Sequence, residues 1–128
     1  MGTTGIQNVY RESSDTYLFV KLEDTKNNRY IKSSPAEVGD CWVPWCSSEG
    51  DFLKKVIIVI NLSKATLVGY VWQDKDSSGD DRVRFSRKGW ETASLSNRIP
   101  GYSNVNTKIN LKIDANDNVS AEQASPVA

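Results

Sequence analysis

Residues 104–113 read NVNTKINLKI, and their side chains alternate between polar types and apolar or β-branched types. One set comprises Val105, Thr107, Ile109, Leu111 and Ile113, and Asn or Lys side chains fill the positions between them. Successive side chains of a β-strand point to opposite faces, so a period of two residues separates the two sets. The stretch therefore predicts an antiparallel strand with one face in a core and the other in water.

Two segments nearer the N-terminus show a similar pattern. Residues 17–22, YLFVKL, alternate likewise, and RYIK at 29–32 resumes the strand pattern after the polar segment at 23–28. Polar turn residues between two such runs are typical of a hairpin. We therefore expect residues 17–22 and 29–32 to pair as neighbouring strands.

The most apolar segment is VIIVINL at 56–62, in which apolar residues occupy both faces. This composition favours a central strand covered on both sides over a helix. TLVGYVWQ at 66–73 follows after a three-residue connection, and RVRFS at 82–86 follows after DKDSSGDD at 74–81. Two consecutive hairpins are the expected arrangement.

Helix signals are few in this chain. Ser34 and Glu37 have the spacing of a capping box, and Pro35 stands at the first helical position. Gly39 would end such a helix within about one turn. We therefore expect at most one or two short helical turns.

Many short strands, with turn residues between them and no amphipathic helix, predict an all-β fold. The expected architecture is a single-domain antiparallel β-sandwich or a jelly-roll-like barrel over residues 1–116. The total length of 128 residues suits one domain. Residues 117–128 lack aromatic side chains and periodicity, so we expect a flexible C-terminal tail there.

The charge balance and the apolar runs restrict the partners. Sixteen basic side chains offset sixteen acidic ones, so the chain has no long-range field that would attract nucleic acid. The longest apolar run, residues 56–60, is far shorter than a transmembrane segment, and residues 1–8 lack the features of a signal peptide. We expect neither nucleic acid nor a membrane span. A cytoplasmic location and a secreted one with the signal peptide removed both stay open.

Histidine is absent from the chain. This absence excludes Ser-His-Asp and Cys-His catalytic sites, histidine general bases, and the usual zinc and iron sites. Carboxylate pairs could still hydrolyse glycosides, but no spacing in the sequence fixes the separation that two such carboxylates need. We therefore expect no catalytic residues and a protein that is not an enzyme.

Both cysteines lie in CWVPWC at 41–46. Two cysteines without further Cys or His cannot complete a tetrahedral metal shell, and their spacing differs from that of the thioredoxin-type redox motif. The pair either closes a small disulfide ring, which a bend at Pro44 would help, or remains as two buried thiols. The sequence does not decide between these two states.

The same segment contains Trp42 and Trp45, which we expect on a loop. One interpretation is that they plug the open end of the sandwich. The other is that at least one indole is exposed and stacks against the apolar face of a sugar ring. In that case Asp40 and Glu49 would hydrogen-bond the sugar hydroxyls.

Tyr70, Trp72 and Trp90 are the remaining candidate ligand-binding residues. Packing in the core or at a sheet edge is the simplest role for the two tryptophans. If Tyr70 and Trp72 faced outward, they would form an aromatic patch on the sheet. Leu67 and Val71 favour the opposite face with equal strength, so the sequence leaves the facing open.

A run of acidic residues supplies candidate calcium ligands, namely Asp74, Asp76, Asp80 and Asp81. The run resembles the opening of an EF-hand loop, but Phe85 stands where that loop needs a Glu. We therefore expect no cofactor and a solvated hairpin tip, with a calcium site of another kind as the alternative.

The excess of Trp and Tyr beside polar loop residues, together with the missing catalytic groups, predicts a non-catalytic, lectin-like carbohydrate-binding domain. Its partner would be a glycan or another small polar ligand. The alternative is a protein- or lipid-interaction module, such as a self-associating sandwich or a toxin or effector subunit. A homodimer is compatible with either function.

Overall fold

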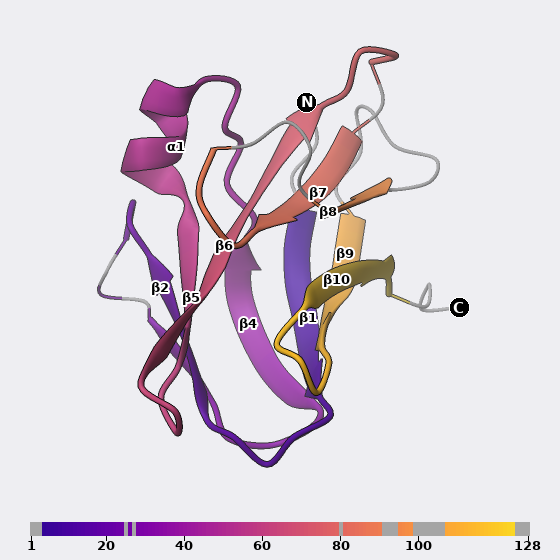
Figure 1. The fold of residues 1–128 in the computed structure, drawn as a ribbon. Helices are drawn as coiled ribbons and strands as arrows, with labels where there is room; N and C mark the ends of the chain where they lie inside the picture. Colours follow the sequence, from indigo (N-terminus) through magenta and orange to yellow (C-terminus); the bar gives the residue numbers. More distant parts are fainter. Residues whose placement is uncertain are drawn as a thin grey trace.

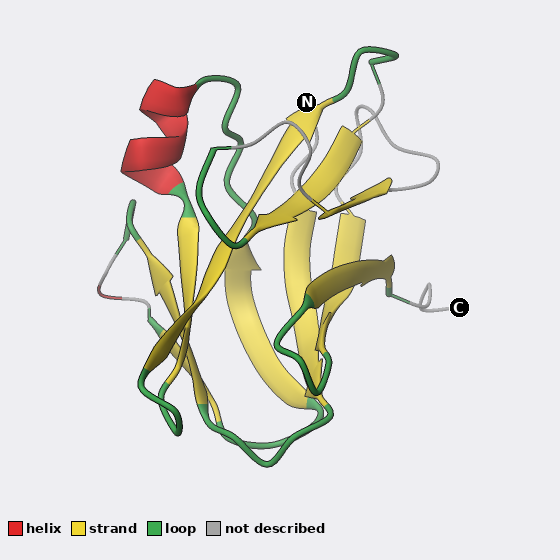
Figure 2. Ribbon diagram, viewed as in Figure 1, coloured by secondary structure: helices red, strands yellow, loops and turns green. Residues whose placement is uncertain are grey.

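The structure is a computed structural model of the 128-residue chain (Figure 1). It describes residues 4–24, 26, 28–79, 81–90, 95–98 and 107–124, and it describes only the backbone of residues 40, 95–98 and 107. Within these residues the chain is mostly β with one short α-helix (Figure 2), which confirms the all-β prediction. The elements are β1 (Thr4–Arg11), β2 (Tyr17–Lys21), β3 (Arg29–Ile31), β4 (Ala36–Trp42), α1 (Glu49–Lys55), β5 (Ile57–Asn61), β6 (Thr66–Lys75), β7 (Asp81–Ser86), β8 (Leu95–Arg98), β9 (Thr107–Ile113) and β10 (Val119–Gln123).

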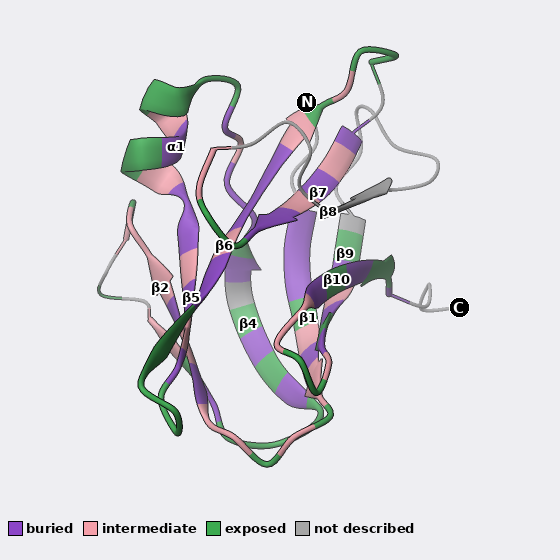
Figure 3. Cartoon of the chain, viewed as in Figure 1, coloured by how far each residue is buried: buried purple, intermediate pink, exposed green. Residues whose placement is uncertain are grey.

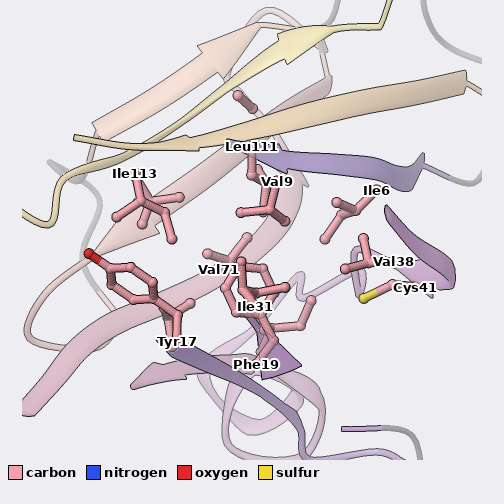
Figure 4. Close-up of a cluster of buried hydrophobic side chains, with 14 of the residues drawn as sticks. Ile6, Val9, Tyr17, Phe19, Ile31, Val38, Cys41, Val71, Leu111 and Ile113 are labelled. Atoms are coloured by element: carbon pink, nitrogen blue, oxygen red, sulfur yellow. The ribbon is translucent and has the colours of Figure 1, made fainter. Parts of the chain in front are cut away.

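The strands form two sheets that share one main core. The four-stranded sheet has the order β10-β9-β1-β4, and the six-stranded sheet has the order β3-β2-β5-β6-β7-β8. Figure 4 shows Val9 and Leu111 of the first sheet facing Phe19 and Val71 of the second within the main hydrophobic cluster. Over the described residues the two sheets do not close into a barrel, so the arrangement is sandwich-like.

The alternation predicted for 104–113 is confirmed for residues 108–113 of β9, and residues 104–106 lie outside the described part of the chain. Ile109, Leu111 and Ile113 are buried, whereas Lys108 and Lys112 are exposed. The pairing differs from the expectation, because β9 runs antiparallel to β10 but parallel to β1. A tight hairpin cannot join parallel strands, and here the chain forms the whole six-stranded sheet between β1 and β9. A local period of two residues does not indicate which strands will pair or in which direction.

The predicted hairpins are present in the six-stranded sheet. β2 pairs with β3, and β5, β6 and β7 pair in succession, all antiparallel. The inner face of β5 buries Ile57 and Val59 in the main core. On its outer face Ile58 packs against a second cluster of buried residues, while Ile60 stays half-buried. The second cluster consists of Cys46, Phe52, Val56 and Trp72. The expected cover on both sides of this strand is therefore partial.

The register between β5 and β6 shifts between Val59 and Ile60. This bulge explains how both Val68 and Val71 reach the main core, although a regular alternation would place them on opposite faces. The outer face of β6 then carries Leu67 before the bulge and Tyr70 and Trp72 after it.

The expected helical turn at Ser34–Glu37 is wrong. The strand β4 begins at Ala36 and pairs with β1, so extended pairing outweighs the local capping signal. The helix is instead α1, whose N-cap Ser48 accepts a hydrogen bond from the backbone N–H of Asp51 at 3.2 Å. No helix within the described residues is long and apolar enough to cross a membrane.

The expected flexible tail after residue 117 is wrong for residues 119–123, which form β10. This strand pairs antiparallel with β9, with Val119 opposite Ile113, and it buries Val119 and Ala121. Its two inward side chains are small, so they left little hydrophobic signal in the sequence. Residues 125–128 lie outside the described part of the chain.

Candidate functional site

The segment CWVPWC carries the chain from the end of β4 in one sheet to the side of β6 in the other. The backbone N–H of Val43 donates to the carbonyl of Thr4 at 2.8 Å, and backbone hydrogen bonds join Gln73 to Pro44 at 2.9 Å and to Cys46 at 3.0 Å. The buried side chain of Gln73 also accepts from the Thr4 hydroxyl and donates to the Val43 carbonyl, both at 2.8 Å. The segment is therefore fixed between the two sheets.

Cys41 and Cys46 are free thiols, and both are buried. Cys41 packs in the main core, whereas Cys46 packs in the second cluster with Phe52 of α1. Burial raises the pKa of Cys41; burial, followed by the nearby Asp51 carboxylate, raises the pKa of Cys46 to about 12. Both thiols therefore stay protonated at neutral pH, and the structure has the thiol pair instead of the disulfide ring.

Trp42 is the last residue of β4 and is 43% exposed. Its expected place on a loop is wrong, because β4 continues to this residue and pairs it with Gly5 of β1. A Cβ atom at position 5 would lie 3.1 Å from Cζ3 of the indole. Glycine thus lets the ring pack closely on β1, and Trp42 faces outward instead of plugging the sandwich.

A pocket of about 270 Å³ opens beside Trp42 on the outer face of the four-stranded sheet. The register of β1 against both of its neighbours, β4 and β9, shifts between Ile6 and Asn8. Bulges of this kind bend strands and often lie next to binding sites. The pocket is lined by Gly5, Ile6, Gln7, Glu37, Gly39, Cys41, Trp42 and Lys108.

The lining combines an aromatic wall with polar groups of different chemistry. Glu37 offers acceptors, Lys108 offers donors and Gln7 offers both. All three side chains are exposed. Figure 3 shows the alternation of buried and exposed residues along β4. Opposite charges on Glu37 and Lys108 leave the pocket close to neutral. Such a site suits a polar, uncharged ligand that also has an apolar face.

Trp72, Trp90 and Tyr70 do not line this pocket. Their rings surround Phe52 of α1, at centroid distances of 5.0 Å from Trp72, 5.4 Å from Tyr70 and 5.7 Å from Trp90. Trp72 is 1% exposed, so its ring is buried in this cluster and offers no stacking surface to a ligand in this structure. The helix α1, which the sequence reasoning missed, covers this part of the outer face of the six-stranded sheet and forms a second core with it.

The other residues predicted with Trp42 are also placed elsewhere. Trp45 is half-buried, forms a parallel bridge with Gln73, and has Nζ of Lys75 at 5.9 Å from its ring centroid. Glu49 is exposed in the first turn of α1 and does not line the pocket. The backbone of Asp40 belongs to β4, and its side chain lies outside what the structure describes. Glu37, which was not predicted, is the described carboxylate that lines the pocket.

The carboxylates predicted as calcium ligands pair with basic side chains of β6 and β7. The ion pairs are Asp74–Arg84 at 2.7 Å, Asp76–Arg82 at 2.6 Å and Asp81–Lys75 at 3.0 Å. Asp80 lies outside the described residues, and within them no three acidic, Cys or His side chains are grouped as a metal site. The three described carboxylates therefore serve as cross-strand partners on this hairpin.

Gln7, Glu37 and Lys108 were not singled out as functional residues. The alternation of β9 did assign Lys108 to the solvent face, which is a usable signal. Gln7 and Glu37 lie on β1 and β4, two strands that were not predicted. No sequence pattern therefore placed these residues beside Trp42.

Comparison of the chain with protein-family models, with curated proteins and with solved structures finds no match in any of the three. The function is therefore inferred from the geometry and chemistry of the site itself.

Proposed function

We propose that this chain is a non-catalytic carbohydrate-binding protein whose site is the Trp42 pocket. A sugar ring presents an apolar C–H face that stacks on the indole, and its hydroxyls hydrogen-bond to Glu37, Gln7 and Lys108. The proposal retains Trp42 from the sequence-based hypothesis and replaces the other expected binding residues with the lining of the pocket.

The observation that carries this proposal is the exposed and supported indole of Trp42. Trp42 is 43% exposed and lines the pocket, while its ring packs on Gly5. A ring held in place before binding loses little conformational entropy when a ligand stacks on it.

The described lining also supports binding without catalysis. Glycoside hydrolysis by carboxylates needs an acid and a second carboxylate across the scissile bond. Among the lining residues whose side chains are described, Glu37 is the one carboxylate. Lys108, which also lines the pocket, offers an ammonium group that suits hydrogen bonding to hydroxyls.

Trp42→Ala is expected to weaken sugar binding at least about tenfold, equivalent to a loss of about 1.4 kcal/mol. The melting temperature should change little, because the ring lies on the surface of the sheet. Glycan-array screening identifies the sugar, and isothermal titration calorimetry of the wild-type and variant proteins measures the affinity.

Tyr30→Ala is the matched control, since Tyr30 is 59% exposed on the other sheet. Its sugar affinity should equal that of the wild type. Unchanged affinity in Trp42→Ala, or no sugar bound by the wild type at millimolar concentration, would contradict the proposal.

A second candidate function is self-association through the six-stranded sheet. The register places Tyr30, Leu18, Ile60 and Leu67 in one row across β3, β2, β5 and β6. Tyr30 is 59% exposed and Leu67 is 52% exposed. A second copy related by a two-fold axis would present the same apolar row, as isologous dimers do.

Leu67→Lys is expected to abolish any concentration-dependent dimer formed by the wild type, because it places a charge within this row. Sedimentation velocity over a range of concentrations measures the effect. Leu53→Lys is the matched control, since Leu53 is 66% exposed on α1 outside the row. A wild-type chain that remains monomeric at every concentration would refute self-association.

A further inference from the structure

A second pocket, of about 460 Å³, lies at the other end of the outer face of the four-stranded sheet. Tyr10 supplies its aromatic group, and Lys112, Ser120 and Glu122 supply polar groups from β9 and β10. Both pockets therefore combine an aromatic side chain of β4 or β1 with polar side chains of the neighbouring strands.

A continuous row of polar side chains connects the two pockets, with Glu37 in the first pocket and Glu122 in the second. The register aligns Glu37, Asn8, Asn110 and Glu122 across β4, β1, β9 and β10. Their immediate neighbours, such as Val9 and Leu111, are buried, so the row faces outward. The amide oxygen of Asn110 is shielded from water and has no hydrogen-bond partner. The row therefore presents polar side chains between the two aromatic positions.

The spacing of the two aromatic positions fits several sugar rings. Gly5, which pairs with Trp42, lies beside Lys108, and Tyr10 lies beside Lys112. Four residues of β9 span about 13 Å at the usual strand rise of about 3.3 Å per residue, which is roughly the length of three pyranose rings in a chain. A single sugar would reach one of the two aromatic side chains.

The charges along this face nearly balance. The basic residues lining the two pockets are Arg11, Lys108 and Lys112, and the acidic ones are Glu12, Glu37, Asp114 and Glu122. Lys112 of β9 and Glu122 of the edge strand β10 form an ion pair at 3.1 Å in the second pocket. An acidic polysaccharide would need a predominantly cationic groove, so the face favours an uncharged ligand.

We propose that the outer face of the four-stranded sheet is an extended platform for a neutral oligosaccharide of about three or more residues, which runs from Trp42 across the polar row to Tyr10. This inference rests on the proposed carbohydrate-binding function and extends it from one pocket to the whole face. The ligand lies along the strands, with a ring stacked at each end and hydroxyls bound by the row between them.

The test is titration calorimetry with oligomers of one to five residues from three neutral series: β-1,4-glucan, β-1,4-mannan and β-1,3-glucan. Affinity is expected to rise at least about tenfold from the monosaccharide to the trisaccharide and then to level off. Tyr10→Ala should remove this gain while preserving the affinity for the monosaccharide. Trp42→Ala should weaken the binding of every length.

Ser120→Arg provides an independent variant, because Ser120 is exposed and a large side chain there fills the second pocket without disturbing the core. It should reproduce the length-selective loss of Tyr10→Ala, and Tyr30→Ala should leave all affinities unchanged. Equal affinity at every length, or tighter binding of a sulfated oligosaccharide, would overturn the platform while leaving the Trp42 pocket intact. No binding in any series would overturn both proposals.

Discussion

Trp72→Ala is expected to lower the free energy of unfolding by about 3–5 kcal/mol, the usual cost of deleting a large buried aromatic side chain. The indole is 1% exposed and lies in the second core with Phe52 in an edge-to-face contact and with Trp90 at 5.6 Å. Its Nε1–H donates to the Asp74 carboxylate at 3.1 Å. Alanine would leave a cavity beneath α1 and remove this hydrogen bond.

Urea denaturation followed by far-ultraviolet circular dichroism measures this loss. Trp42→Ala is the comparison, because it removes the same side chain from an exposed position and should cost no more than about 1 kcal/mol. If Trp72→Ala cost no more than Trp42→Ala, the second core would not be packed as described.

Gly69→Ala is expected to destabilise the chain by about 3 kcal/mol or more, at or above the upper end of the usual range for overpacking. A Cβ atom at this position would lie 2.5 Å from the carbonyl oxygen of Ser86 and 2.6 Å from Cε1 of Phe85. The carbonyl belongs to the backbone and cannot rotate away, and the Phe85 ring is buried. Strands β6 and β7 would have to separate to accept the methyl group.

Thermal and urea unfolding of Gly69→Ala measure this effect. Gly39→Ala is the matched control, because a Cβ atom at position 39 has no neighbour within 4 Å. Its free energy of unfolding should stay within about 0.5 kcal/mol of the wild-type value. A Gly69→Ala variant as stable as Gly39→Ala would contradict the close approach of β6 and β7.

The strands that were predicted are those whose alternating pattern of polar and apolar side chains lies within a few consecutive residues. The alternation of residues 104–113 identified β9, and two alternating runs beside a polar segment identified the hairpin of β2 and β3. By contrast, β1 and β4 gain their conformation from pairing with each other and with β9. Ser34 and Glu37 even suggested a helix, because a capping-box spacing is local and sheet pairing is not.

The candidate site was predicted in part for the same reason. The aromatic content of CWVPWC drew attention to Trp42, and the alternation of β9 assigned Lys108 to the solvent face. Which aromatic residues are exposed depends on the layers that cover them. Because α1 covers part of one sheet, Trp72 is in a core, whereas the end of β4 leaves Trp42 in solvent.

By itself, the sequence determined the all-β class, the outward face of β9 and the exclusion of histidine chemistry, since each of these follows from composition or from a period of two residues. The tertiary structure decided the parallel pairing of β1 with β9, the position of the β1 bulge beside the pocket and the facing of each tryptophan. A strand pattern defines two faces but does not state which one another layer will cover. In CWVPWC, tertiary packing buries Cys41 in the main core and Cys46 in the second cluster, whereas Trp42 stays exposed beside the pocket.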